Sequence, residues 1–216
     1  MATENHSIIL IIGGGWHTPE HYDKLKAALE ATGNEVHCPA HLSMNQARPP
    51  TAGLAEDTAS MRSYAEKLVG TNALYGLGLE ERNARGQSGG VSDLVYLCAF
   101  ALPENGSMAG KVTDMGHEAL MPIAFDFADD KTVLCRDPKA QLIGEIAGDR
   151  EAEVEPYLAS LVRWNGQLPF DYQKSMVALL EENSRKVKTF ELATGRCPNL
   201  TATVVNVINQ VVRRAI

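Results

Sequence analysis

Ile8-Ile-Leu-Ile-Ile12, followed directly by Gly13-Gly-Gly15, is the stretch that decides the fold class of this chain. Five consecutive apolar residues, four of them isoleucine, are typical of a strand that is buried on both faces of a parallel sheet. A helix is expected to begin at Thr18 and Pro19, because threonine caps helices and proline suits their first turn. The stretch therefore predicts the first strand and the first strand-to-helix turn of an α/β fold.

The alternation of strand and helix continues for two more elements and then fails. A second strand is predicted at residues 36–39 and a helix at 54–69, which is the rhythm of a doubly wound, mostly parallel sheet. The next strand pattern comes only at residues 93–100, so two predicted helices follow each other with no strand between them. We predict a single α/β domain over residues 1–216.

The second half of the chain departs further from that rhythm. Residues 103–167 show no strand pattern and contain an amphipathic stretch at 151–164, which predicts a helical lid inserted after a strand. A helix is predicted at 171–182 without a strand before it. The chain is then expected to finish with a strand at 189–194 and a helix at 200–216. About two inner strands of a complete sheet are therefore missing.

Composition and charge limit the classes of function. The chain has 216 residues, of which 44% are hydrophobic and 22% charged, as in ordinary globular proteins. Its net charge of -7 argues against nucleic-acid binding, which needs a basic face. The longest apolar runs are too short for a membrane span or a signal peptide, so we expect a cytoplasmic protein. No metal or cofactor is expected, because no pair has zinc-site spacing among Cys38, Cys98, Cys135 and Cys197.

Seven segments of the chain carry a resemblance to one family, and together they cover nearly its whole length. They are Gly14–Tyr22, Arg48–Gly53, Gly70–Gly76, Cys98–Pro103, Leu161–Gly166, Asp171–Ser175 and Cys197–Leu200. With these segments the chain resembles α/β-hydrolases of the AB hydrolase-1 type, in particular fungal esterase-like proteins, and more distantly the plant methylesterases and hydroxynitrile lyases. The resemblance implies an α/β-hydrolase fold with a helical lid, and descent from an ester or acyl hydrolase of small metabolites.

The resemblance also implies a catalytic machinery whose parts are missing here. Such enzymes place a serine on a strand-to-helix elbow, an acid after a later strand and a histidine on a late loop. The serine strand and its elbow would stand between Val69 and Gly70, which are adjacent, and the acid-bearing strand would stand between Gln167 and Asp171. The histidine position holds Arg196, which stays charged and cannot act as a general base. We therefore predict no serine-hydrolase activity and no catalytic residues.

One segment matches the serine motif G-x-S-x-G but stands at the wrong place in the order of predicted elements. Gly86-Gln-Ser-Gly-Gly90 has the letters of the elbow, with Ser88 as its serine. The elbow needs a strand before it and a helix after it, whereas the order expected around Ser88 is the reverse. We interpret Ser88 as a loop residue. Asp171, which lies near the missing acid strand, is likewise interpreted as a helix cap.

Gly14, Gly15, Trp16 and His17 form the remaining candidate for a ligand site. In the family that the chain resembles, backbone N–H groups of this loop hold an oxyanion, and glycines let a ligand approach the backbone. A tight strand-to-helix turn without a ligand is the plainer interpretation. A dinucleotide site is not expected, because Thr18 stands where the third glycine of G-x-G-x-x-G belongs.

The six histidines give no convincing metal site. His17 and His21 are four residues apart, but Pro19 is expected to start the helix between them, so they would not share a helix face. We expect the histidines to be solvated or to contact the lid. Phe125 and Phe127 are expected to pack the lid.

Three interpretations of the whole chain stay open. The first is a truncated or wrongly spliced hydrolase, which the loss of two strands would leave poorly stable. The second is a non-hydrolytic enzyme, such as an isomerase, cyclase or lyase of natural-product biosynthesis. The third is a binding or interaction protein that pairs through an exposed sheet edge. In the third interpretation the partner is an intact relative. A small-molecule ligand or an ester-like substrate is expected for the others, with neither nucleic acid nor membrane, and the oligomeric state stays open.

Overall fold

The computed structural model describes residues 7–69, 78–99, 102, 106–130, 132–143, 151–162, 188–190 and 202–212. The chain divides into two compact units. The first unit comprises residues 1–13, 17–95 and 199–216, and the second comprises residues 14–16 and 96–198. The single domain over residues 1–216 stays a prediction.

The first unit is built on a pair of parallel strands. β1 (Ile8–Leu10) pairs with β2 (Glu35–His37), so that Ile9 stands beside Val36. The backbone between them forms a 3-10 turn, η1 (Pro19–Tyr22), and the helix α1 (Asp23–Glu30). This β-α-β unit confirms the first two predicted strands and the helix start at Thr18, which is the cap residue before Pro19.

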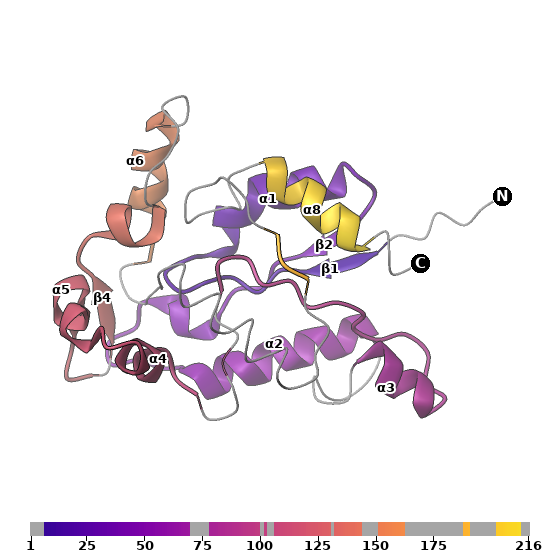
Figure 1. Ribbon diagram of the computed structural model, residues 1–216, viewed down its shortest axis with the longest axis horizontal. Helices are drawn as coiled ribbons and strands as arrows, with labels where there is room; N and C mark the ends of the chain where they lie inside the picture. Colours follow the sequence, from indigo (N-terminus) through magenta and orange to yellow (C-terminus); the bar gives the residue numbers. More distant parts are fainter. Residues whose placement is uncertain are drawn as a thin grey trace. The chain divides into compact units, whose positions relative to one another are not determined.

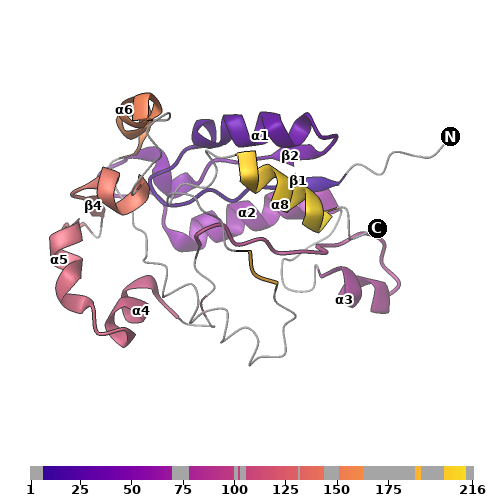
Figure 2. The ribbon, with the colours of Figure 1, turned by 45° about the horizontal axis from the view of Figure 1, so that its top comes forward.

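Helices lie on both sides of the β1–β2 pair (Figures 1 and 2). α1 and the last helix, α8 (Ala202–Val212), lie on one side, and α2 (Leu54–Val69) lies on the other. The bounds of α2 are those predicted from the sequence. The core of the unit is made of fully or nearly buried apolar side chains: Leu25, Leu29, Val36, Met61, Ala65, Val204, Val205 and Ile208.

Asn209 joins α8 to the turn after α1. Its side-chain oxygen accepts hydrogen bonds from the Thr32 hydroxyl at 3.1 Å and from the Asn34 amide at 3.0 Å. Asn209 is buried, so these two donors satisfy an oxygen that water does not reach readily. The predicted helix at 200–216 is thus confirmed over its described part and is fixed to the first unit by polar contacts as well as by apolar packing.

Two expectations about the sheet are wrong. The run Ile8–Ile12 was expected to be buried on both faces, yet Ile8 is 49% exposed and Ile12 53% exposed. The predicted strand at residues 93–100 is absent over its described part, 93–99, where Leu94, Val95 and Tyr96 are exposed. An apolar run forms a strand only where a neighbouring strand supplies ladder hydrogen bonds, and within the described residues β2 is the one partner of β1.

A short helix and a loop precede that segment. α3 (Leu79–Ala84) is followed by a loop in which Gly86 and Gly89 have positive φ angles of 71° and 70°. The buried Arg82 guanidinium donates to the carbonyl of Ser88 at 2.6 Å and to that of Gly89 at 2.8 Å. The charged side chain of α3 therefore holds the backbone of this loop in place.

The second unit combines short helices with a small antiparallel hairpin over its described residues. The strands β3 (Phe125–Phe127) and β4 (Val133–Cys135) pair with each other, which corrects the expectation that residues 103–167 hold no strand. Strands of three residues are too short to show the alternation by which strands are recognised in a sequence. The other elements over the described residues of this unit are α4 (Met108–Asp114), η3 (Glu118–Leu120), α5 (Met121–Ala124), η4 (Lys139–Ile143) and α6 (Glu151–Ser160).

The amphipathic stretch 151–164 is helical over residues 151–160, as α6, and it buries Val154 and Tyr157. Phe125 and Phe127 pack edge to face, with ring centroids 6.4 Å apart, and Phe127 is 58% exposed. That these two rings pack a lid stays a prediction. Among the described residues no helix combines the length and the apolar character needed to cross a membrane.

Candidate functional site

In doubly wound sheets, ligands bind in the crevice beyond the carboxyl ends of the strands. The candidate loop, Gly14 to His17, follows the carboxyl end of β1. Its residues are divided between the two units: Gly14, Gly15 and Trp16 belong to the second, whereas Gly13 and His17 belong to the first. Each unit therefore supplies its own set of contacts to this part of the chain.

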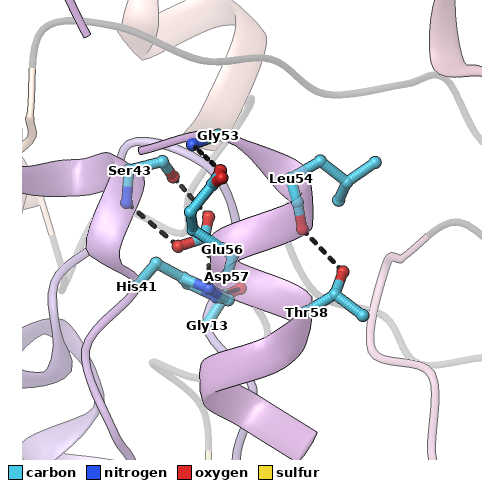
Figure 3. Close-up of polar contacts among 8 residues, drawn as sticks. All are labelled: Gly13, His41, Ser43, Gly53, Leu54, Glu56, Asp57 and Thr58. Atoms are coloured by element: carbon cyan, nitrogen blue, oxygen red, sulfur yellow. Dashed lines mark hydrogen bonds and ion pairs between the residues drawn. The ribbon is translucent and has the colours of Figure 1, made fainter. Parts of the chain in front are cut away.

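On the first unit's side, Gly13 is held by a histidine from the loop after β2. His41 places its Nε2 atom 2.8 Å from the carbonyl oxygen of Gly13 (Figure 3). A carbonyl oxygen only accepts, so this ring nitrogen carries a proton. A Cβ atom at residue 13 would come within 3.3 Å of the Tyr22 ring and 3.8 Å of the His41 ring, which favours glycine at this position.

Asp57 lies beside His41 and is the centre of a small polar cluster, which we call the Asp57 clamp (Gly13, His41, Ser43 and Asp57). The Asp57 carboxylate accepts the backbone N–H of Ser43 at 2.9 Å and also the Ser43 hydroxyl (Figure 3). Its Oδ2 atom is 3.7 Å from Nδ1 of His41. Asp57 stands in the first turn of α2, where the positive end of the helix dipole stabilises a carboxylate.

The start of α2 is fixed by further local contacts. The Glu56 carboxylate accepts the N–H of Gly53 at 2.8 Å, and the Thr58 hydroxyl donates to the carbonyl of Leu54 at 2.6 Å (Figure 3). The first bond lowers the pKa of the exposed Glu56 carboxyl, since it favours the charged form. The residues around Asp57 are thus held in place by their own helix, and the clamp joins that helix to the end of β1.

The Asp57 clamp contains a serine, a histidine and an aspartate, but in an order that does not activate the serine. In a serine hydrolase the imidazole stands between the hydroxyl and the carboxylate and takes the serine proton. Here the carboxylate stands between Ser43 and His41, and the Ser43 hydroxyl donates to Asp57. The cluster therefore serves to fix the loop after β1, and its serine is not a nucleophile of the hydrolase kind.

On the second unit's side, Trp16 adopts a backbone conformation that is uncommon for a bulky residue. Its φ angle is 62°, in the left-handed region, and its side chain is 1% exposed. The indole lies nearly parallel to the Phe125 ring, with centroids 5.9 Å apart, and the backbone carbonyl of Trp16 accepts the N–H of Val162 at 2.9 Å. The indole Nε1 is buried, and no hydrogen-bond partner for it stands among the residues that the structure describes.

His17 and His21 are buried, so they are not solvated, and the other expectation, that they contact the lid, stays a prediction. Their rings meet edge to face with centroids 5.2 Å apart, and the His17 ring also lies beside that of Tyr22. The N–H of Thr18 donates to Nδ1 of His21 at 2.9 Å. Burial lowers the pKa of His21, an effect that the Thr18 carbonyl oxygen, 3.2 Å from Nδ1, partly opposes because it accepts a hydrogen bond from the charged ring. A neutral His21 ring therefore fits its place in this turn.

Ser88 is exposed on the loop after α3, with its carbonyl held by Arg82. Burial raises the pKa of the Cys38 and Cys135 thiols to about 11, so neither is a thiolate nucleophile near neutral pH. Arg196 and Asp171 lie outside the described residues. Gly14 and Gly15 make further contacts, and their role as oxyanion donors stays a prediction.

Sequence reasoning missed the Asp57 clamp. Its members come from three places along the chain, residue 13, residues 41–43 and residue 57, and no short motif links them. One local signal was present. The first turn of a helix stabilises a carboxylate, so an aspartate there predicts hydrogen bonds with polar residues of the preceding loop. In the described ranges, no three side chains among His, Cys, Asp and Glu gather as metal ligands would.

No protein-family model, curated protein or solved structure matches this chain in a comparison of sequence or fold. The α/β-hydrolase resemblance therefore rests on the seven sequence segments. The geometry of the described residues adds two facts to it: the polar cluster at the end of β1 has the wrong order for a serine nucleophile, and the loop beyond it contains a buried indole with an unused donor.

Proposed function

We propose that this chain is an α/β-hydrolase-like protein that binds a small, carbonyl-bearing ligand at Trp16 and does not hydrolyse it through a serine. The ligand class is that of esters and related carbonyl compounds with an apolar body. The proposed fold rests on the sequence resemblance, and the proposed ligand class rests on the surroundings of Trp16.

The observation that carries the proposal is the buried indole N–H. Leaving a buried donor without an acceptor costs about 1–3 kcal/mol, so such groups are rare in native proteins. Nε1 of Trp16 is in this state, and its ring stacks on Phe125. A ligand carbonyl oxygen would accept the N–H, and an apolar ligand body would suit the aromatic pair.

The absence of serine chemistry is supported by two placements. The Ser43 hydroxyl donates its hydrogen bond to Asp57, which holds the serine in a structural contact. Ser88 is exposed on a loop that follows α3, with no strand leading into it over the described residues 78–87. Together with Arg196 at the expected histidine position, these placements support binding without covalent turnover.

Binding should depend on the ligand's carbonyl oxygen. We expect methyl 3-phenylpropanoate, an unactivated alkyl ester, to bind at least about tenfold more tightly than butylbenzene, which has a similar shape and no acceptor. One net hydrogen bond of about 1.4 kcal/mol gives this factor. Titration calorimetry measures both dissociation constants.

The Trp16→Phe variant is the matched control, because it keeps an aromatic ring and removes the N–H. The preference for the ester is expected to fall to about one in this variant. Equal affinity of the natural chain for both compounds would refute the Trp16 site. Analysis of the ester after the titration separates binding from turnover, and formation of 3-phenylpropanoic acid or an isomer would favour an enzyme.

A further inference from the structure

A second polar cluster, away from the Asp57 clamp, joins β2 to α2. Nε2 of His37 lies 2.7 Å from Oε1 of Glu35, and Nδ1 of the same ring lies 3.0 Å from the hydroxyl of Tyr64. Glu35 and His37 are two residues apart on β2, so their side chains leave the strand on the same face. Tyr64 comes from the middle of α2, and the centroid of its ring is 5.7 Å from that of His37.

The chemistry of the three groups fixes the direction of their hydrogen bonds. The Glu35 carboxylate only accepts, so Nε2 of His37 is the donor of the 2.7 Å contact. In the neutral ring Nδ1 then carries the lone pair and accepts the phenolic proton of Tyr64. The order is carboxylate, imidazole, hydroxyl, which is the order in which an imidazole can remove a hydroxyl proton.

This order differs from that in the Asp57 clamp in the group that stands in the middle. There the carboxylate separates Ser43 from His41, whereas here the imidazole separates the carboxylate from the hydroxyl. The cluster is also reachable: the side chain of His37 is 22% exposed, and Tyr64 is partly exposed. A small solute can therefore approach a hydroxyl group that already has a base in hydrogen-bond contact with it.

We propose that Tyr64 is a nucleophilic phenol that accepts an acyl group from an activated ester. The phenolic oxygen forms a bond to the acyl carbon while the bond from that carbon to the leaving aryl oxygen breaks. Nδ1 of His37 takes the phenolic proton and passes it to the departing aryl oxide, so the products are acyl-Tyr64 and the free aryl alcohol. Glu35 is a positioning residue that holds the imidazole in the tautomer whose Nδ1 faces Tyr64.

The test uses p-nitrophenyl acetate with the full chain, followed by trypsin digestion and mass spectrometry. Cleavage after Arg62 and Lys67 gives the peptide Ser63–Lys67, in which fragment ions separate Tyr64 from Ser63. Tyr96 is the internal control, because it is 49% exposed and no histidine hydrogen-bonds it in the described part of the chain. We expect Tyr64 to be acetylated at least about tenfold faster than Tyr96, against the order that exposure alone would give.

Variants identify the base. His37→Gln keeps a polar side chain but cannot take the proton, and we expect it to lower the rate at Tyr64 by about 100-fold, the lower end for general-base catalysis. Glu35→Gln should lower it less, since the amide still accepts from the ring. His117→Gln, at an exposed histidine of the second unit, should leave it unchanged. Tyr64→Phe should leave the peptide 63–67 unmodified.

The ratio of the Tyr64 rate to the Tyr96 rate keeps the test valid if a variant unfolds. Unfolding exposes both phenols alike and raises the rate at Tyr96, whereas loss of the base lowers the rate at Tyr64 alone. The proposal is overturned if Tyr64 is no faster than Tyr96, if His37→Gln leaves the ratio unchanged, or if the acetyl group is found on Ser63.

Discussion

Leu29→Ala is expected to lower the free energy of unfolding by about 2–5 kcal/mol, the range for deleting a fully buried leucine side chain. Leu29 is 0% exposed in the core of the first unit, on the helix that contacts both β2 and α8. Its removal leaves a cavity in the apolar core between α1, β2 and α8. Since domains are stable by only about 5–15 kcal/mol, this loss is a large fraction of the total.

Leu54→Ala is the matched control for Leu29→Ala, because the chemical change is identical and Leu54 is 84% exposed. Its effect is expected to stay within about 0.5 kcal/mol. Urea unfolding followed by circular dichroism measures both. Equal effects of the two substitutions would mean that α1 does not pack as described.

Asp57→Ala is expected to have the second largest effect, a loss of about 2–3 kcal/mol. The substitution removes the acceptor of two Ser43 donors, and hydrogen bonds to a charged group contribute about 1.5–3 kcal/mol. It also removes the carboxylate that faces His41 at 3.7 Å. The same unfolding experiment measures the change.

Two further variants show whether that loss comes from the clamp. Ser43→Ala removes only the hydroxyl contact and should cost about 1 kcal/mol. Asp93→Ala removes an exposed carboxylate that lies outside the clamp and should cost less than about 0.5 kcal/mol. If Asp57→Ala proves no more damaging than Asp93→Ala, the clamp does not hold the loop after β1.

The elements that could be predicted from the sequence are those specified by their own residues. Thr18 and Pro19 mark a helix start through local backbone chemistry, and the helix at 54–69 begins with acidic residues and ends before a glycine. These signals act within one or two turns of the chain. They do not depend on what the element packs against, so the observed bounds agree with the expected ones.

The errors fall where structure depends on distant partners. Ile8–Ile12 and residues 93–100 have similar strand composition, yet β1 has β2 beside it and residues 93–99 have no ladder partner among the described residues. Ile8 and Ile12 are exposed where β1 has β2 as its one strand partner among the described residues. A second neighbouring strand would pair with the edge of β1 opposite β2. Helices covering that wider sheet would bury Ile8 and Ile12.

The candidate sites divide in the same way, into one that a local sequence signal indicates and others that residues far apart in the sequence form. The loop Gly14 to His17 was found because three glycines after a strand are a local signal, and Trp16 was found with it. The Asp57 clamp and the contact of His37 with Tyr64 join residues 14 and 27 positions apart, and neither spacing follows a motif. Only the fold brings these groups together, so residue type alone could not distinguish His37 from a solvated histidine.

The most direct test of the central claim, that this chain has no serine nucleophile, is a fluorophosphonate labelling experiment with the site of attachment mapped by mass spectrometry. We expect no serine to carry the label, and hydrolysis of an unactivated alkyl ester to stay at the rate without protein. Label on Tyr64 would agree with the account. One equivalent of label on a serine, lost when that serine is replaced by alanine and accompanied by alkyl-ester turnover, would contradict it.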